Sequence, residues 1–469
     1  MTDVATPPPL SPEDDLLWRI EADPVLRSTV LVVGLLDRAP GPRRLASAVT
    51  RACREVPVLS HRLAPPPLGL GRPAWRRAEV SLDHHVRRAR IAGGGLDEVL
   101  ALVAPDAAAP FDLERPPWSL TIVEGLDGGA AAFALRFHHA IADGVGALRL
   151  AHHLLDPTRR GPARRRDEPA PPDGGTTAGR DEAAPRDAGI AGAAARVVRA
   201  ATVPARHPVD AVTAPTRLGR SLWRFLRPAP ATGSPLLAGR GLDRALHART
   251  VPLADLRAAA AAVDGTVNDV LLAAVSGAYR RYHERHGVTV VEMPTSIPVN
   301  RRGDDEPGGG NRFTMARLVL PVDDPDPATR ARIAGAIVRR WRAEPALGAT
   351  GVVAAGLDLL PPAAVARTLG ALLRGIDLNV VDLRGLDGGA FLAGTRVERL
   401  FAFAPTAGTA CSVTLLSHGP DACVAVTADR AAITDPVAFV ACLDEGLDEV
   451  VALGRPAAPD DDWRSRRGR

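Results

Sequence analysis

The stretch from residue 157 to residue 187 divides the chain, and this division limits what the remainder can fold into. It reads PTRRGPARRRDEPAPPDGGTTAGRDEAAPRD, which is dense in Pro, Gly and charge. Such a segment buries too little apolar surface to offset the entropy lost on ordering, so we predict a linker here. A short helical stretch and more Pro-broken chain follow, so the linker is expected to span 157–239. We therefore expect an N-terminal lobe over 10–156 and a C-terminal lobe over 240–455.

Length and composition are consistent with two folded lobes. The chain has 469 residues, whereas a single hydrophobic core stops growing at about 250–300 residues. Apolar residues make up 46% of the chain and charged residues 24%, which is typical of a globular protein rather than a disordered one. The net charge of +4 is too small to indicate a nucleic-acid-binding protein.

Cysteine usage and the lack of apolar targeting segments predict the compartment. The four Cys include no CxxC pair, so we expect buried free thiols rather than a disulfide framework or a zinc site. The acidic, Pro-rich start does not resemble a secretory signal, and no run of about 18 apolar residues predicts a membrane span. We expect a soluble, cytoplasmic protein without a metal or a prosthetic group.

Apolar periodicity predicts that strands and helices interleave in both lobes. Strand-length apolar runs occur at 28–36, 130–137, 288–298, 315–321 and, as a pair of strands, within 410–427. Helical spacing occurs at 45–54, 144–155 and 268–281. This interleaving indicates an α/β layered architecture.

For two segments of the chain, contact with a lipid surface is an open alternative. The apolar tract 345–373 predicts a pair of core helices, and docking on a lipid surface is the alternative. The predicted linker also carries a cluster of arginines: Arg159, Arg160, Arg164, Arg165 and Arg166. These are either solvated charges or an attachment to an anionic leaflet.

The strongest local signal lies where the strand predicted at 130–137 ends. The chain continues there as His138-His139-Ala140-Ile141-Ala142-Asp143-Gly144. An imidazole can accept a hydroxyl proton near neutral pH, an Asp in the turn can hold the local geometry, and Gly permits torsions that a Cβ forbids. The alternative is a half-buried pair without function. The pairs at 84–85 and 152–153 lack the trailing Asp-Gly and are assigned to structure.

This segment resembles the HHxxxDG motif of the CoA-dependent acyltransferase superfamily, and other residues resemble its bacterial wax ester synthase/diacylglycerol acyltransferase (WS/DGAT) branch. Short motifs follow in that family's order over most of the chain. They are Ser11-Pro12-Glu13-Asp14, Arg115-Pro116-Pro117-Trp118, Asn268-Asp269, Pro298-Val299-Asn300-Arg301-Arg302, Gly310-Asn311, Asn379-Val380, Leu392-Ala393-Gly394 and the strand 412–417. Each motif is weak alone, but the set in this order is specific.

The resemblance implies an α/β fold of two chloramphenicol-acetyltransferase-like lobes, each a mixed sheet packed with helices, with an active-site tunnel between them. It implies that His139 is the general base, supported by His138, Asp143 and Gly144. The base would deprotonate the hydroxyl of a diacylglycerol or a long-chain fatty alcohol, which attacks acyl-CoA and yields triacylglycerol or wax ester plus CoA. The co-substrate is acyl-CoA, and no cofactor is implied.

The same resemblance assigns further residues. Those expected to line the tunnel or bind substrate are Asn268, Asp269, Ser417 and Trp118. Those expected to be structural are Arg302, Gly310, Asn311 and Asn379, with Arg302 as the expected ion-pair partner of Asp143. A simple helix N-cap is the alternative for Asn268 and Asp269.

Departures from the family pattern bear on the acceptor and on efficiency. Val381-Asp382 stands where the family has Pro-Gly, and His418 and Pro117 replace a Tyr and a Leu. Two other functions therefore stay open: the same motif acting on another acceptor or on a carrier-bound acyl donor, and a catalytically weak lipid-binding relative. Lipid substrates also imply peripheral contact with the inner membrane, a lipid-droplet surface or lipid inclusions.

Overall fold

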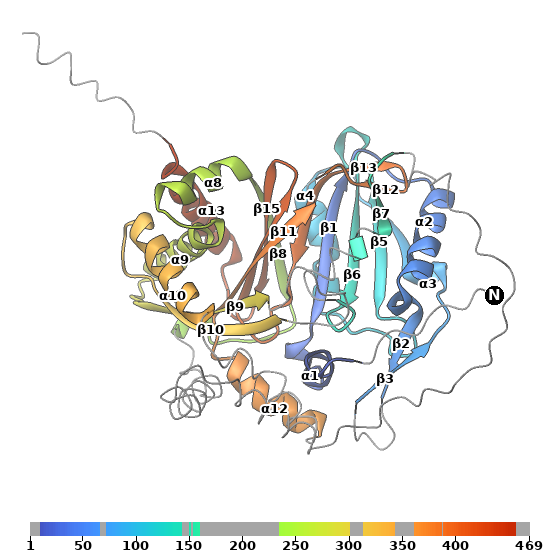
Figure 1. Cartoon of the computed structure of the whole chain (residues 1–469), viewed down its shortest axis with the longest axis horizontal. Coiled ribbons are helices and arrows are strands. Elements are labelled where there is room, and N and C mark those ends of the chain that lie inside the picture. The colour runs from blue at the N-terminus through green and yellow to red at the C-terminus, as the bar shows by residue number, and fades with distance from the viewer. Residues whose placement is uncertain are drawn as a thin grey trace, which may run out of the picture.

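The computed structural model describes residues 10–65, 72–142, 150–151, 153–159, 234–300, 313–342, 361–386 and 388–455. Most of the predicted linker lies outside these residues, as does most of the helix predicted at 144–155. Of the predicted site residues, Asp143, Gly144, Arg302, Gly310 and Asn311 also lie outside them. Within the described residues, two mixed sheets with packed helices stand side by side, which confirms the predicted α/β fold of two lobes (Figure 1).

The first sheet has seven strands in the order β4-β5-β6-β1-β13-β12-β7. Their bounds are β4 Val86–Arg90, β5 Trp118–Glu124, β6 Ala131–His138, β1 Thr29–Leu36, β13 Thr395–Phe403, β12 Phe391–Leu392 and β7 Leu155–Asp156. β4 runs parallel to β5, and the other neighbours are antiparallel. The β-branched run that predicted a strand at 28–36 forms β1, at the centre of this sheet. A separate hairpin pairs β2 His61–Ala64 with β3 Ala74–Arg77.

β12 and β13 belong to this first sheet although they come from the part of the chain predicted to form the C-terminal lobe. β13 pairs antiparallel with β1, so that Leu31 lies opposite Phe403 and Gly34 opposite Leu400. The sheets therefore do not follow the division of the chain at 157–239. The pattern of a strand shows which of its faces is buried, but not which sheet edge it completes, because backbone hydrogen bonds carry no sequence identity.

The second sheet has six strands in the order β10-β9-β11-β14-β15-β8. Their bounds are β10 Phe313–Pro321, β9 Glu292–Asn300, β11 Leu378–Leu386, β14 Cys411–His418, β15 Asp421–Asp429 and β8 Arg244–Pro252. β11 runs parallel to both of its neighbours, but its pairing with β9 is limited to Leu378 and Asn379. Beyond Asn379 the two strands diverge, which opens the sheet on that side.

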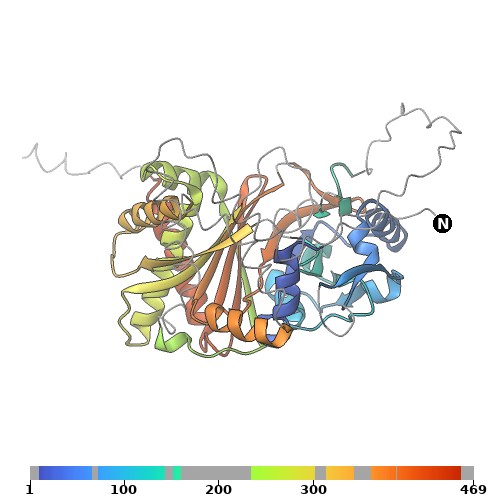
Figure 2. The same cartoon turned by 60° about the horizontal axis from the view of Figure 1, so that its bottom comes forward.

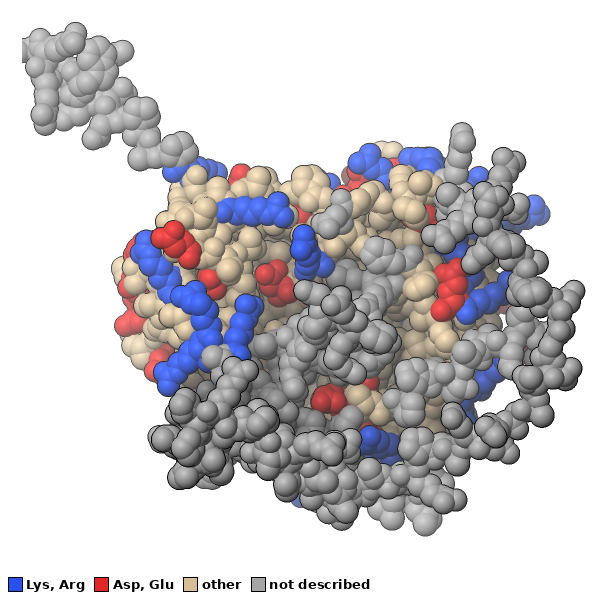
Figure 3. Space-filling model, viewed as in Figure 1, with Lys and Arg blue, Asp and Glu red and all other residues tan. Residues whose placement is uncertain are grey.

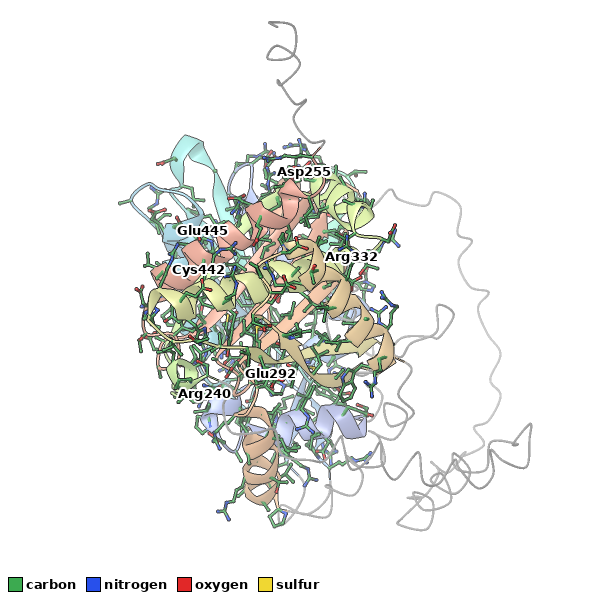
Figure 4. All side chains as sticks on the ribbon, turned by 90° about the vertical axis from the view of Figure 1, so that its left-hand side faces the viewer. Arg240, Asp255, Glu292, Arg332, Cys442 and Glu445 are labelled. Atoms are coloured by element: carbon green, nitrogen blue, oxygen red, sulfur yellow. The ribbon has the colours of Figure 1, made fainter. Side chains whose placement is uncertain are left out.

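Helices cover the outer faces of both sheets (Figure 1). The second sheet packs against α8 Leu253–Ala262, α9 Val267–Arg285, α10 Pro327–Arg342 and α13 Pro436–Ala452, and the first lobe contains α2 Pro42–Glu55, α3 Leu82–His85 and α4 Leu96–Val103. Figure 4 looks onto α13, where the labelled Glu445 pairs with Arg285 of α9 at 2.5 Å. Cys442 on α13 and the other three cysteines are free and buried, as predicted.

Two helices bridge the lower ends of the lobes: α1 Pro12–Ile20 and α12 Pro362–Leu373. They lie side by side in Figure 2. Val365 and Ala366 of α12 are buried against Ile20 of α1 and Leu26. The described part of the 345–373 tract is therefore a helix with one face packed against α1; residues 343–360 lie outside the described residues. Among the described helices none alone has the length and apolar composition to span a membrane, although α8 and α9, which meet at 91°, satisfy both criteria together.

Candidate active site

A cavity of about 500 Å³ lies between the two sheets. Both lobes line it: β1, β6 and β13 on one side, β9, β11 and β14 on the other, with α1 and α12 contributing Leu17, Ile20 and Leu373. Most of the lining side chains are apolar, and the volume is within the range of about 300–1,000 Å³ that is usual for ligand pockets. This is the position at which the resemblance predicts the tunnel.

His139 stands on the wall of this cavity. It directly follows β6, and its N–H donates to the carbonyl oxygen of Ser28 over 2.8 Å. Ser28 also lines the cavity. The side chain of His139 is half-buried, so the cavity is the space that its imidazole can reach.

His138 has different surroundings, because successive side chains at the end of a strand point to opposite faces. Its imidazole is 1% exposed, and its Nδ1 accepts the N–H of Ala140 over 3.0 Å. Its Nε2 lies 2.9 Å from Oε1 of Glu21, and the rings of Trp18 and Phe111 pack against it. The two adjacent histidines are thus separated by geometry: His139 reaches the cavity, and His138 is held inside the first lobe.

Glu21 is the site residue that sequence reasoning missed. It caps the C-terminal end of α1, and its Oε1 also accepts the N–H of Ser28 over 2.7 Å. Burial raises the pKa of Glu21, but its interaction with His138, the Ser28 N–H and the charge of Arg27 together lower it below its ordinary value. No local sequence pattern identifies Glu21, because a Glu at the end of a helix is usually a surface residue.

The cavity wall formed by β11 and β14 changes from polar to apolar along the strands. Three rows of residues pair between β11 and β14: Asn379–Ser412, Val381–Thr414 and Leu383–Leu416. All of them except Ser412 line the cavity, as do Asp382 and Arg384. Within these rows the lining changes from the polar side chain of Asn379 to the apolar side chains of Leu383 and Leu416, which can accommodate a hydrocarbon chain.

Strand pairing places the polar row, Asn379–Ser412, at the same end of the cavity as His138 and His139. Nε2 of His418, the last residue of β14, lies 3.4 Å from the carbonyl oxygen of Val397. Val397 in turn pairs with Leu36, the last residue of β1. His138 pairs with Thr29, the first residue of β1. The apolar row, Leu383–Leu416, consequently lies toward the end of β1 that is opposite to the histidine pair.

Asn379, for which the resemblance implies a structural role, ties three strands together. Its Oδ1 accepts the hydroxyl of Ser296 on β9 over 3.1 Å, and its Nδ2 donates to Ser412 Oγ on β14 over 3.0 Å. These bonds hold β9 against β11 where their backbone pairing ends. Asn379 and Ser296 also line the cavity.

Asn268 and Asp269 do not line the cavity, contrary to the expectation. They lie in the first turn of α9, whose N-cap is Thr266. Asp269 is buried, and its Oδ2 accepts the N–H of Thr266 over 2.9 Å while its own N–H donates to the Thr266 hydroxyl. This capping box satisfies N–H groups that the helix leaves without partners, so Asp269 takes part in capping α9 although the N-cap itself is Thr266.

Trp118 and Ser417 are likewise absent from the cavity wall. Trp118 is buried in the core of the first lobe, where its indole N–H donates to the Leu59 carbonyl oxygen over 2.9 Å. Ser417 Oγ accepts the N–H of Gly385 over 2.9 Å. A Cβ at Gly385 would lie 1.8 Å from the Ser417 carbonyl oxygen, so this position of β11 requires glycine.

The departure at Val381-Asp382 has a structural consequence. β11 continues without interruption through these residues and pairs with β14 as far as Leu383 and beyond. Asp382 reaches the cavity at the open edge of β11. Although Asp382 is exposed toward this space, desolvation by the surrounding protein raises the pKa of its carboxyl, and the charge of Arg342 offsets part of this effect.

In the part of the chain that the structure describes, no three His, Cys, Asp or Glu side chains gather as metal ligands. That the protein needs no cofactor remains a prediction.

Comparison with known families identifies the family of the chain. The wax ester synthase/diacylglycerol acyltransferase catalytic domain matches residues 10–271, and the WS/DGAT C-terminal domain matches residues 309–450. The chain belongs to the WS/DGAT family. It is therefore an acyltransferase, and its HHxxxDG segment lies within the part matched by the catalytic domain.

Two proteins of Mycobacterium tuberculosis H37Rv, both provisionally named diacylglycerol O-acyltransferases, are similar along most of their length. One is 35% identical over 458 residues, covering 96% of this chain and 93% of the relative. The other is 30% identical over 420 residues, covering 86% and 87%. The recognition of the WS/DGAT family from short motifs is thereby confirmed.

Solved structures share the fold. The wax ester synthase/diacylglycerol acyltransferase from Marinobacter aquaeolei VT8 superposes with a TM-score of 0.62 at 20% identity, covering 95% of this chain and 99% of that one. The first condensation domain of the calcium-dependent antibiotic synthetase gives 0.60 at 16% identity, covering 97% and 98%. At these identities the likeness concerns the fold alone.

Proposed function

We propose that this WS/DGAT protein esterifies a lipid hydroxyl, on a diacylglycerol or a long-chain fatty alcohol, with the acyl group of acyl-CoA, and that His139 is the general base. The position of His139 carries this proposal. Its imidazole stands on the wall of the cavity between the lobes, at the end where the wall is polar.

The reaction needs a base and a dry channel rather than a covalent nucleophile, because a thioester is already reactive. His139 takes the proton of the acceptor hydroxyl as the hydroxyl oxygen attacks the thioester carbonyl carbon. The tetrahedral intermediate then collapses, the C–S bond breaks, and the departing sulfur takes the proton from His139. The products are an ester and free CoA, and His139 is restored.

The polarity of the cavity supports a long-chain acyl group. The reacting groups are polar and belong near His139, Ser28 and Asn379, whereas Leu383 and Leu416 line the opposite end. Hydrocarbon buried there gains free energy at about 25 cal/mol per Å² removed from water. We therefore propose that the acyl chain extends from His139 toward these two leucines.

Release of CoA thiol from palmitoyl-CoA tests the proposal. The reaction is run with hexadecanol, with a diacylglycerol and without an acceptor, and in parallel with His139→Ala. Acceptor-dependent release that falls about 100-fold or more in the variant is expected, since a general base contributes about 10²–10⁴-fold. Release that is unchanged in His139→Ala, or that does not depend on either acceptor, contradicts the proposal and favours another acceptor or a binding role.

We also propose peripheral contact with a lipid surface, because acceptors of this kind are dissolved in membranes. On the face shown in Figure 3, Arg side chains gather at the left, over α10. The exposed arginines of α10 are Arg332, Arg339, Arg340 and Arg342. Such residues attract anionic lipid by about 1 kcal/mol each. Co-sedimentation with vesicles that contain phosphatidylglycerol, compared with vesicles of phosphatidylcholine alone, tests this contact.

A further inference from the structure

The hydrogen bond that Nδ1 of His138 accepts determines where the single ring proton of this residue lies. Nδ1 accepts the N–H of Ala140 over 3.0 Å, so Nδ1 carries no proton in this arrangement. The proton is therefore on Nε2, which lies 2.9 Å from Oε1 of Glu21. Contacts with Trp18 and Phe111 restrict the ring further. His138 is thereby fixed both in orientation and in tautomer, with its lone pair already used.

The same carboxylate oxygen reaches the backbone beside His139. Oε1 of Glu21 accepts the Ser28 N–H over 2.7 Å, and the Ser28 carbonyl oxygen accepts the His139 N–H over 2.8 Å. One carboxylate oxygen thus connects the end of α1 with the residue before β1 and, directly or through Ser28, with the two histidines at the end of β6. The side chains of Glu21 and His138 are 20% and 1% exposed, so water replaces these bonds poorly.

We infer that Glu21 is a positioning residue for the reaction proposed above: it acts through His138 and Ser28 to hold His139 at the cavity wall. Glu21 does not itself line the cavity that contains His139. Its effect is on the placement of the base, and a displacement of about 1 Å in a catalytic group can lower the rate about 100-fold. This inference rests on the proposed role of His139 as the base.

Kinetics of Glu21→Ala and Glu21→Gln test the inference. Glu21→Ala is expected to lower kcat about 10- to 100-fold while KM for both substrates changes less than about threefold, because placement of the base is lost and substrate contacts are not. Glu21→Gln keeps an oxygen that accepts both N–H groups, so it is expected to recover most of kcat. If Glu21→Ala does not fold, Glu21→Asp is measured instead, because its shorter side chain moves the carboxylate away from His138.

The chain offers a matched control in the same lobe. Glu55 Oε2 lies 2.9 Å from His153 Nδ1, which is a pair of the same type and length, but its side chains are 45% and 44% exposed. Glu55→Ala is expected to leave kcat unchanged. Equal losses in Glu21→Ala and Glu55→Ala would overturn the inference, and so would a kcat for Glu21→Ala within about twofold of the wild type.

A double-mutant cycle separates positioning from general destabilisation. Because Glu21 acts through His138 as well as through Ser28, Glu21→Ala combined with His138→Ala should lower kcat by less than the product of the two single effects. Losses that multiply would show independent roles and overturn the inference.

A spectroscopic readout keeps the inference testable apart from the proposed function. Two-bond ¹H–¹⁵N correlation spectra of protein labelled at histidine should show His138 protonated on Nε2 in the wild type and altered in Glu21→Ala. His138 protonated on Nδ1 in the wild type would overturn the inference. A wild-type protein that releases no CoA with any acceptor would overturn the proposed function instead, while the spectra still decide the role of Glu21.

Discussion

Replacing Asp377 by Asn tests whether a buried carboxyl makes the C-terminal lobe less stable as the pH rises. Asp377 immediately precedes β11, and its side chain is fully buried. Tyr279 of α9 donates its hydroxyl to Asp377 Oδ2 over 2.7 Å. Burial raises the pKa of the carboxyl from an ordinary 3.8 to about 6, although the Tyr279 hydroxyl and the charge of Arg240 each lower it.

The sign and size of the effect follow from proton linkage. Between pH 3.8 and about 6 the folded protein binds more protons at Asp377 than the unfolded chain does. The contribution of this group to the free energy of unfolding is therefore fully present below the unfolded pKa and is lost as the pH rises through the folded pKa. At 1.36 kcal/mol for each pKa unit, the loss amounts to about 3 kcal/mol.

Urea unfolding of wild type and Asp377→Asn at a series of pH values measures this loss. Asn does not titrate and still offers an oxygen to Tyr279, whereas every other titrating group is common to both proteins. The free energy of unfolding of the variant minus that of the wild type should rise by about 2.5 kcal/mol between pH 4 and pH 7, because the rest of the loss occurs below pH 4. Asp83→Asn, at an exposed position of α3, controls for the loss of one surface carboxylate.

A difference that stays constant within about 0.5 kcal/mol over this range would refute the reasoning, because it would mean that folding leaves the pKa of Asp377 unchanged. Tyr279→Phe provides a second check. It removes a hydrogen-bond donor that lowers the pKa of Asp377, so the range over which stability falls should extend above pH 6.

Two further predictions concern the cavity and the first lobe. Leu416→Trp should lower kcat/KM for palmitoyl-CoA about tenfold relative to octanoyl-CoA, because the larger ring occupies the apolar end of the cavity; an unchanged ratio would show that the acyl chain lies elsewhere. Trp118→Phe should lower the free energy of unfolding by about 1 kcal/mol through loss of the bond to Leu59, without changing either KM. Urea unfolding measures the change in stability, and steady-state kinetics measures KM. A raised KM would show that Trp118 contributes to substrate binding.

Local pattern was sufficient to predict many of the elements, among them the strand that ends at the histidine pair. The apolar run at 130–137 forms β6, and the β-branched run at 28–36 forms β1. The period of two along a strand also means that adjacent histidines at its end face different surroundings. The resemblance to the family then assigned the role of base to His139 rather than to His138, and His139 lies on the cavity wall.

Other predictions failed because a residue type is compatible with several environments. Asp269 has the same side chain whether it binds substrate or caps α9, and only the position of Thr266 and the burial of the helix end select the cap. Trp118 likewise suits a substrate wall or a core, and the neighbouring Leu59 carbonyl oxygen places it in the core.

The sequence by itself determined many of the strands and helices and the family to which the chain belongs, because these depend on periodicity, on near neighbours and on the order of short motifs. Tertiary structure alone decided that β13 completes the first sheet and that Glu21 holds His138. It also decided that the polar row of β11 and β14 lies at the histidine end of the cavity. Hydrogen bonds and burial depend on separation in space, and residues far apart in the chain come together only when both sheets are assembled.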